Sequence, residues 1–229
     1  MFTSVIIPAA GAGERMGTAV SKQFLLLQGK PIIIHTLERF QMCGAVNEII
    51  IAVQPTTRQQ VEFLVGEFNL SKAAKIVEGG KRRQDSVSNA LSRIDPRTEI
   101  VIVHDAVRPF IQQKVILESI EKAKVHSAAV VAVRVKDTVK VGNDEGRFER
   151  TLDRSVLWSA QTPQTFTRQL LLDAYEKAGR EHVEATDDAS LIERLGIRPA
   201  IVEGSFDNIK ITTPDDLDFA NVLVKRFKD

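Results

Sequence analysis

Short apolar runs rich in β-branched residues alternate along the chain with longer stretches in which apolar positions recur at helical spacing. Such runs predict strands, and such stretches predict amphipathic helices. The expected strands cover Ser4–Ile7, Glu48–Val53, Lys75–Val77, Glu99–Val103 and Ala128–Val135, with later ones near Arg198–Val202 and Asn208–Ile211. The expected helices cover Pro31–Met42, Thr57–Phe68, Arg83–Arg93, Gln113–His126, Thr167–Ala178, Asp187–Leu195 and about Pro214–Phe227.

The expected strands have the composition of a sheet that is buried on both faces. The run Ile49–Val53 is apolar throughout, which is typical of parallel strands covered by helices on each side. Strands that alternate with helices form right-handed crossovers and a mostly parallel sheet. We therefore expect an α/β fold whose ligands bind at the carboxyl ends of the strands. The loop after Ile7 and the residues after Val103 both fall there.

Residues 136–152 interrupt this alternation with a polar hairpin. Residues 135–141 and 147–152 have strand character and flank the turn sequence Gly142–Gly146, a combination typical of a β-hairpin. Its apolar stripe is thin, and an isolated two-stranded hairpin has only marginal stability in water. Two alternatives stay open: the hairpin lies on its own domain, or it is an arm that docks on a second subunit. No linker or repeat divides the chain, so we expect one domain, residues 1–229, that carries this hairpin.

Composition narrows the classes of function. Apolar residues make up 43% of the 229 residues, enough for a full core. Lysine and arginine number 31 and aspartate and glutamate 30, so no overall positive charge favours nucleic acid as a partner. The single cysteine, Cys43, cannot form an internal disulfide, which fits a reducing cytoplasm. No basic leader precedes the first apolar run and no run is long enough to span a membrane, so we expect a cytoplasmic protein without a membrane partner.

The first expected strand leads into a glycine-rich loop that contains Gly11, Gly13 and Gly17. Small residues let the backbone approach a ligand and point its N–H groups at negative oxygens. Arg15 and Lys22 add two cations that can neutralise a polyphosphate. The glycine spacing matches neither the dinucleotide-binding fingerprint nor the Walker loop. The loop predicts a nucleoside triphosphate site, and the alternative is a strand-to-helix turn that binds no ligand.

A second candidate segment, residues 104–109, follows the strand that ends at Val103. Asp105 in this place is a natural Mg²⁺ ligand, because Mg²⁺ takes one or two carboxylates together with phosphate oxygens. The alternative for Asp105 is a cap or turn aspartate. Arg108 can bind a phosphate through two hydrogen bonds, or it can pair with an acidic neighbour at the surface. His104 has no nucleophile to activate, and we expect it to be buried and hydrogen-bonded.

Further polar positions lie at expected strand ends and helix starts. The turn Gly79–Gly80 lets a base or ribose approach closely, and Ser86 is expected to donate a hydrogen bond to that ligand. The two basic residues after the turn are expected to be solvated. Thr186 precedes two aspartates, which is also the pattern of a helix N-cap. Lys210 lies between two isoleucines, so its side chain points either into the cleft or into solvent.

Taken in order, these residues resemble the 2-C-methyl-D-erythritol 4-phosphate cytidylyltransferases of the non-mevalonate isoprenoid pathway over essentially the whole chain. The matching segments begin with Pro8-Ala9-Ala10-Gly11-x-Gly13-x-Arg15-Met16 with Lys22-Gln23, Gly79-Gly80-x-x-Arg83-x-x-Ser86-Val87 and His104-Asp105-Ala106-x-Arg108-Pro109. They continue with Asp137-Thr138, Asp153-Arg154, Thr162-Pro163-Gln164, Thr186-Asp187-x-Ala189-Ser190, Glu203-Gly204 and Asn208-Ile209-Lys210. Each segment alone is a weak signal, whereas the ordered set is specific.

The resemblance implies a Rossmann-like nucleotidyltransferase fold and a homodimer in which the hairpin arm reaches across the interface. It also implies that CTP and 2-C-methyl-D-erythritol 4-phosphate react to give 4-diphosphocytidyl-2-C-methyl-D-erythritol and pyrophosphate. The ribitol-5-phosphate cytidylyltransferases are an alternative, but their pattern has a glycine in place of Ala10 and differs around Asp153 and Trp158. On both counts this chain is similar to the methylerythritol group.

Within this reaction we assign each candidate residue a hypothetical role. Arg15 and Lys22 would be the catalytic cations that neutralise charge during in-line attack on the α-phosphate. Mg²⁺ would bridge the phosphates on Asp105, with Asp207 as a second ligand. The CTP-binding residues would be Pro8, Ala9, Ala10, Gly11, Ala12, Gly13, Gly80, Ser86 and Ala106. The acceptor-binding residues would be Arg108, Thr138, Arg154, Thr186 and Lys210, with Thr138 and Arg154 supplied by the second subunit.

Two functions from other classes remain as alternatives. A non-catalytic nucleotide sensor would bind CTP and release no pyrophosphate with any acceptor, and the joint presence of Arg15, Lys22 and Asp105 argues against it. An NAD-dependent oxidoreductase is disfavoured by the wide glycine spacing and by the lack of an acidic ribose ligand after the second strand.

Overall fold

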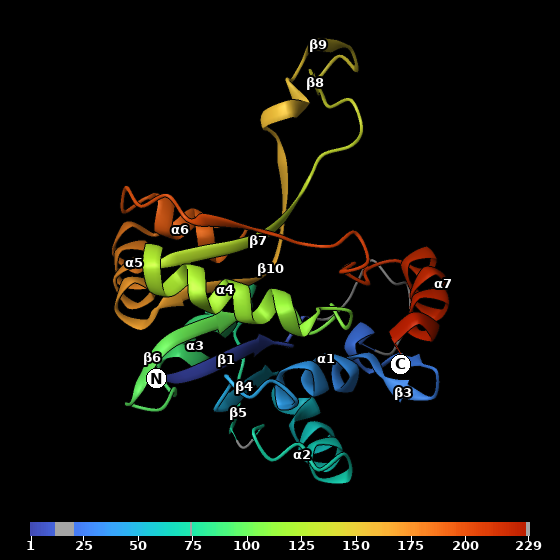
Figure 1. Ribbon diagram of the computed structural model, residues 1–229, viewed down its shortest axis with the longest axis vertical. Helices are drawn as coiled ribbons and strands as arrows, with labels where there is room; N and C mark the ends of the chain where they lie inside the picture. Colours follow the sequence, from blue (N-terminus) through green and yellow to red (C-terminus); the bar gives the residue numbers. More distant parts are fainter. Residues whose placement is uncertain (12–20, 74, 228–229) are drawn as a thin grey trace.

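The computed structural model describes residues 1–11, 21–73 and 75–227, and its centre is a seven-stranded sheet with the order β11-β7-β10-β6-β1-β4-β5 (Figure 1). The strands are β1 (Phe2–Pro8), β4 (Glu48–Val53), β5 (Lys75–Glu78), β6 (Thr98–Val103), β7 (Ala128–Arg134), β10 (Trp158–Thr167) and β11 (Ala200–Glu203). Neighbouring strands from β6 to β5 pair in parallel, and so do β11 and β7. β10 runs antiparallel to both of its neighbours, β6 and β7.

Helices cover both faces of this sheet. They are α1 (Ile32–Gln41), α2 (Arg58–Glu67), α3 (Arg83–Leu91), α4 (Gln113–His126), α5 (Arg168–Glu181) and α6 (Asp188–Glu193). α1, α2 and α4 pack into the apolar core on one face, and α3, α5 and α6 pack into the core on the other. In β4, Ile49 and Ile51 point into the first core and Ile50 into the second. The expected α/β fold with a mostly parallel, doubly covered sheet is confirmed.

A third, smaller core lies beside the cleft described below. It joins α7 (Pro214–Leu223) to β2 (Leu26–Leu27), which pairs with the short strand β3 (Lys30–Pro31). α7 begins with a capping box, in which Thr213 accepts from the Asp216 N–H and the Asp216 carboxylate accepts from the Thr213 N–H. Short 3-10 turns lie at Lys22–Phe24, Pro55–Thr57, Arg154–Val156 and Val224–Phe227.

Two expectations about strands were wrong. Asn208–Ile211 is not a strand; it is an irregular segment, held to the body by a hydrogen bond from the Ile211 N–H to the carbonyl of Val107. Residues 158–167, to which the periodicity assigned no strand, form β10 in the middle of the sheet. Its polar residues are buried and paired, as when the Thr165 hydroxyl bonds that of Ser119 at 2.9 Å. Because buried polar residues do not give an apolar strand pattern, the periodicity missed this strand.

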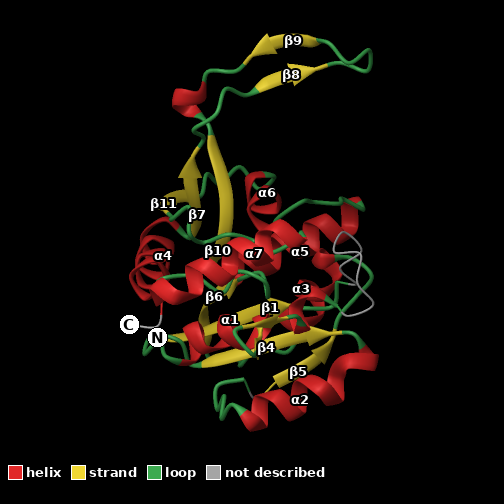
Figure 2. Cartoon of the chain, turned by 90° about the vertical axis from the view of Figure 1, so that its right-hand side faces the viewer, coloured by secondary structure: helices red, strands yellow, loops and turns green. Residues whose placement is uncertain are grey.

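The hairpin is present as β8 (Lys140–Gly142) and β9 (Phe148–Thr151), and it extends away from the body on long segments that follow β7 and precede β10 (Figures 1 and 2). Every residue of β9 is exposed, and the Phe148 side chain is 76% exposed. The hairpin therefore does not lie on its own domain. Docking on a second subunit stays a prediction.

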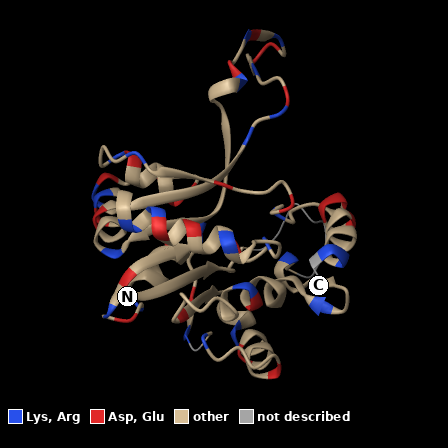
Figure 3. Cartoon of the chain, in the orientation of Figure 1, with Lys and Arg blue, Asp and Glu red and all other residues tan. Residues whose placement is uncertain are grey.

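Basic and acidic residues are interspersed along the chain, including the arm (Figure 3). This mixture agrees with the nearly balanced charge of the sequence. Among the residues that the structure describes, no helix has the length and apolar character needed to cross a membrane.

Candidate active site

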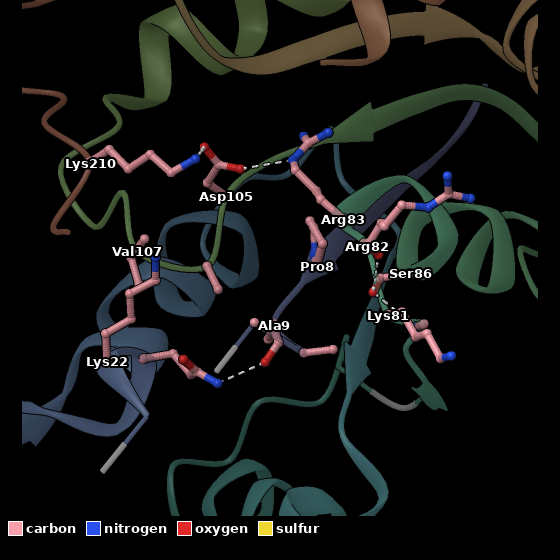
Figure 4. Close-up of a pocket in the computed structure, with 15 residues that line it drawn as sticks. Pro8, Ala9, Lys22, Lys81, Arg82, Arg83, Ser86, Asp105, Val107 and Lys210 are labelled. Carbon is pink, nitrogen blue, oxygen red and sulfur yellow. Dashed lines mark hydrogen bonds and ion pairs between the residues drawn. The ribbon is translucent and has the colours of Figure 1, made fainter. Parts of the chain in front are cut away.

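A cleft opens at the carboxyl ends of β1 and β6 and beside the turn that follows β5, where the fold predicts ligand binding (Figure 4). Its lining comes from the start of the glycine-rich loop, the 3-10 turn that begins at Lys22, the turn after β5 with the start of α3, the segment after β6, and the irregular segment before α7. The lining residues are Pro8, Ala9, Ala10, Gly11, Lys22, Gln23, Gly80, Lys81, Arg82, Arg83, Ser86, Asp105, Ala106, Val107 and Lys210.

The glycine-rich loop begins in a tightly held conformation. The buried Gln23 donates a hydrogen bond to the carbonyl of Ala9 at 2.8 Å, and Gln54 donates one to the carbonyl of Ala10 at 2.8 Å. These two amides hold the backbone at the end of β1. Lys22 lines the cleft at the start of its 3-10 turn, as expected. The predicted site residues Ala12, Gly13 and Arg15 lie outside the described residues.

The turn after β5 contains glycines because no larger residue fits. A Cβ atom on Gly79 would overlap the Cβ of Ala10 and lie 3.0 Å from the Ser86 hydroxyl. The buried Ser86 hydroxyl accepts from the Gly80 N–H at 3.0 Å and donates to the carbonyl of Arg82 at 3.1 Å. Ser86 therefore lies in the cleft as predicted, but its proton goes to the turn and not to a ligand. The turn presses against the glycine-rich loop and shapes one wall of the cleft.

Asp105 is the centre of a cluster of cations, and only 7% of the residue is exposed. One oxygen lies 3.2 Å from Arg83 Nε, and the other lies 2.9 Å from Lys210 Nζ and 3.4 Å from Arg108 Nε. Burial alone would raise the pKa of Asp105, but the attraction of Arg83, Lys210 and Arg108 outweighs it and holds that pKa well below the ordinary value. Asp105 is therefore a buried, permanently charged carboxylate with cations on both oxygens.

The alternatives left open for Lys210 and His104 are now decided. Lys210 points into the cleft toward Asp105 and not into solvent (Figure 4). His104 is fully buried and lies 3.0 Å from the carbonyl oxygen of Arg108, which confirms the expectation.

Arg108 does not line the cleft. It donates to the carbonyl of Asn208 at 2.7 Å and pairs with Asp105, and burial lowers its pKa. This geometry favours the alternative of an acidic partner, although the pair is buried and not at the surface. The structure therefore gives no support to a phosphate contact by Arg108.

Arg83 is a residue of the site that the family resemblance includes but to which the sequence assigned no role. It follows two basic residues and was taken as part of a helix start, yet its side chain turns inward and lies between Asp105 and the buried Asp188. Burial alone would lower its pKa, but the attraction of Asp188 and Asp105 prevails and raises it. By contrast, Arg82 lines the cleft and pairs with Asp85 and Glu184 near the surface. The matching segment Gly79-Gly80-x-x-Arg83 includes Arg83 and leaves position 82 open, but it does not indicate that Arg83 pairs with two buried carboxylates.

The other predicted acceptor and metal residues are not in the cleft of this chain. Thr186 is exposed and is not the cap of α6, because Asp187 accepts from the Ser190 N–H at 3.0 Å instead. Asp207 is half-buried and does not line the cleft. Thr138 and Arg154 are exposed at the base of the arm, away from the cleft. Among the described residues, no group of three or more metal-ligating side chains comes together.

A mostly parallel, doubly covered sheet with a glycine-rich loop after its first strand, and with cations gathered at the adjoining strand end, defines the nucleotidyltransferase class of α/β proteins. Residues 3–226 match the sequence profile of the 2-C-methyl-D-erythritol 4-phosphate cytidylyltransferase family, and the chain belongs to that family.

Relatives and solved structures agree with this membership. The chain is 44% identical over 222 residues to the 2-C-methyl-D-erythritol 4-phosphate cytidylyltransferase of Syntrophus aciditrophicus, a match that covers 96% of this chain and 95% of the relative. It is 46% identical over 217 residues to that of Bacillus cytotoxicus, with 95% of each chain covered. The crystal structure of the Francisella tularensis 2-C-methyl-D-erythritol 4-phosphate cytidylyltransferase superposes with a TM-score of 0.80 at 36% identity, covering 97% of this chain and 100% of that one. The 4-diphosphocytidyl-2C-methyl-D-erythritol synthase of Anaerococcus prevotii gives a TM-score of 0.86 at 30% identity, covering 98% and 96%.

Proposed function

We propose that this protein transfers the cytidylyl group of CTP to 2-C-methyl-D-erythritol 4-phosphate and releases pyrophosphate. One observation above all supports the proposal: in a member of this family, the cleft at the ends of β1 and β6 brings together Lys22, Arg83 and Lys210 next to the glycine-rich loop. Two anionic substrates can meet only where positive charge offsets their repulsion. The family membership favours methylerythritol phosphate over ribitol 5-phosphate as the acceptor.

The proposed reaction is an in-line displacement at phosphorus. A phosphate oxygen of the acceptor forms a bond to the α-phosphorus of CTP, and the bond from that phosphorus to the bridging oxygen of the β-phosphate breaks. The electron pair leaves with pyrophosphate. The acceptor phosphate is already anionic, so it needs no general base. We propose that Lys22 and Arg15 neutralise the charge that develops on the triphosphate, which is the main requirement of such a step.

We propose that the cytidine lies against the part of the cleft with small side chains. The residues assigned to it that the structure describes all line the cleft: Pro8, Ala9, Ala10, Gly11, Gly80, Ser86 and Ala106. Ala12 and Gly13 keep the same proposed role. Because a Cβ on Gly79 would overlap the Cβ of Ala10, glycine at this position lets the turn approach the start of the glycine-rich loop closely.

Mg²⁺ is part of the proposal, but the described residues do not fit a protein-held ion. Both oxygens of Asp105 already face cations, which would repel a divalent cation placed between them. Asp207 does not line the cleft. The roles of Asp105 and Asp207 as metal ligands stay predictions without support from this geometry. We assign Mg²⁺ to the triphosphate of CTP, whose oxygens are suitable ligands, and the assay below measures whether turnover depends on it.

We propose that the acceptor binds through Lys210 and Thr186, together with Thr138 and Arg154 of a second copy of the chain in a homodimer. The exposed, isolated arm supports this arrangement, because a two-stranded hairpin needs a partner surface. Two inactive variants test it. Lys22→Ala and Arg154→Ala chains are co-refolded in equal amounts, so half of the dimers are mixed. If each arm reaches the site of the other subunit, one site of every mixed dimer has both an intact Lys22 and an intact Arg154. The mixture should then recover about a quarter of wild-type turnover. Turnover no greater than that of the two variants measured separately would contradict an arm that crosses the interface.

The function itself is tested by pyrophosphate release from CTP and Mg²⁺, with methylerythritol 4-phosphate and ribitol 5-phosphate offered separately and with a chelator control. We expect release with the first acceptor alone. Release with ribitol 5-phosphate alone would show that the proposed acceptor is wrong, while the proposed cytidylyl transfer from CTP would stand. A protein that binds CTP and releases pyrophosphate with neither acceptor would be a nucleotide sensor.

A further inference from the structure

Asp188 is a buried acid that the proposed reaction does not use. It is the first residue of α6, only 1% of it is exposed, and it does not line the cleft. One carboxylate oxygen accepts a hydrogen bond from the Tyr175 hydroxyl at 2.5 Å, and the other lies 2.8 Å from Arg83 Nη1. Burying a carboxylate is costly unless it is paired, so these two contacts account for its presence in the core.

The backbone around Asp188 is fixed by a residue of the central sheet. Gln164, on β10, accepts a hydrogen bond from the Ala189 N–H at 2.9 Å and donates one to Asp187 at 2.7 Å. Asp187 in turn caps α6 by accepting from the Ser190 N–H. The start of α6 is therefore held to β10 independently of Arg83. Asp188 is a rigid anchor, and Arg83 is the more adjustable partner.

Arg83 connects this anchor to the cleft. Its Nη1 pairs with Asp188. Its Nε lies 3.2 Å from Asp105, and Lys210 lies on the other side of Asp105 at 2.9 Å (Figure 4). The buried Nη2 of Arg83 has no hydrogen-bond partner among the residues that the structure describes. A continuous chain of contacts thus runs from the neutral Tyr175 hydroxyl in the core through Asp188, Arg83 and Asp105 to Lys210 in the cleft.

We propose that Asp188, supported by Tyr175, is a positioning residue that acts through Arg83 to keep Asp105 and Lys210 in place for the acceptor phosphate. This inference rests on the proposed function, in which Lys210 binds the acceptor. With Asp188 in place, the charge of Arg83 is shared between two carboxylates. Without it, Asp105 alone balances Arg83, and the guanidinium moves toward Asp105 and competes with Lys210 for that carboxylate. The acceptor end of the site is then disturbed more than the nucleotide end.

Steady-state kinetics of four variants test the inference. Asp188→Asn removes the charge but keeps the shape, Tyr175→Phe removes only the supporting hydroxyl, and Asp188→Glu restores the charge. The exposed Asp173 on α5 supplies a matched control, Asp173→Asn. We expect Asp188→Asn to raise the KM for the acceptor about tenfold, with the CTP affinity changed less than about twofold. Tyr175→Phe should raise the same KM about threefold. The acceptor KM of Asp188→Glu should lie closer to the wild-type value than that of Asp188→Asn.

A merely structural role predicts a different result. Partial unfolding lowers the concentration of active enzyme, so kcat falls while both KM values stay at the wild-type level. If Asp188→Asn does not fold, Tyr175→Phe decides, because it keeps the charge pair and loses one hydrogen bond. An unchanged acceptor KM in folded Tyr175→Phe and in folded Asp188→Asn would overturn the inference.

A second readout separates this inference from the proposed function. The side-chain ¹⁵N–H signals of Arg83, assigned by their loss in Arg83→Lys, report on the guanidinium without any turnover. We expect them to shift in Asp188→Asn and in Tyr175→Phe and to stay unchanged in Asp173→Asn. Unchanged signals in Asp188→Asn would show that Asp188 does not hold Arg83. If the Arg83 signals shift in the variants but the wild-type protein shows no turnover, Asp188 does hold Arg83 and the proposed function is wrong. The role of Asp188 in acceptor binding would then be wrong as well.

Discussion

His104, at the strand end next to Asp105, couples the stability of the cleft to pH. Its side chain is fully buried and packs edge-on against the ring of Phe40. Its Nε2 lies 3.0 Å from the carbonyl oxygen of Arg108, so Nε2 carries the proton of the neutral ring. Nδ1 has no hydrogen-bond partner in the described part of the chain. Protonation would bury a charge and an unpaired N–H, and burial accordingly lowers the pKa of His104 from 6.5 to about 4.

The direction of the effect follows from the two pKa values. The unfolded chain takes up this proton as the pH falls below 6.5, whereas the folded protein takes it up only near pH 4. Stability from neutral His104 is therefore fully present above the unfolded pKa and is lost as the pH falls toward the folded pKa. At 1.36 kcal/mol per pKa unit, the whole loss is about 3 kcal/mol, and about 2 kcal/mol of it has occurred by about pH 5.

Urea unfolding followed by circular dichroism measures this loss directly. We compare the free energy of unfolding at about pH 7.5 and about pH 5 in the wild type and in His104→Gln, with His126→Gln as an exposed control. The wild type and His126→Gln should lose about 2 kcal/mol more than His104→Gln over this range. A packing defect in His104→Gln would lower its stability equally at both pH values and would not mimic this difference. Parallel curves for the wild type and His104→Gln would refute the reasoning.

Two further substitutions test the cleft. Lys22→Ala should lower kcat about a hundred- to a thousandfold, because it removes a charge that we propose neutralises the triphosphate. Lys81→Ala, at the exposed edge of the same cleft, should keep kcat within about threefold of wild type. Wild-type turnover in Lys22→Ala would contradict the proposed mechanism. Gly79→Ala drives a methyl group into Ala10, so it should cost about 1–3 kcal/mol of stability and weaken CTP binding in calorimetry. Gly44→Ala has open space around its Cβ and should leave CTP binding unchanged; equal effects of the two glycine substitutions would show that the contact is unimportant.

Local periodicity predicted most of the fold. The bounds of β4 and α4 agree with expectation to the residue, because each carries its own uninterrupted pattern of apolar positions. β10 was missed as a strand because its buried face is polar, and its hydrogen bonds are made to distant helices. The strand expected at Asn208–Ile211 failed for the opposite reason: the alternating pattern is present, but none of the strands in the described part of the chain pairs with it.

The sequence also located the cleft. The start of the glycine-rich loop, as far as Gly11, lines it together with Ser86, Asp105 and Lys210. It did not reveal how the charges are paired. Arg108 looked like a phosphate ligand but is buried against a carbonyl and a carboxylate, and Asp105 looked like a metal ligand but is surrounded by cations.

The sequence by itself determined the layered α/β fold, the family and the position of the cleft, because apolar periodicity and glycine spacing are properties of short segments. The tertiary structure alone decided that Arg83 turns inward and which acids hold it. Arg83 lies about a hundred positions from Asp188, and their pairing depends on α3 and α6 packing on the same face of the sheet. Burial then makes each pairing strong, because a charge that has lost its water is stable only beside an opposite charge.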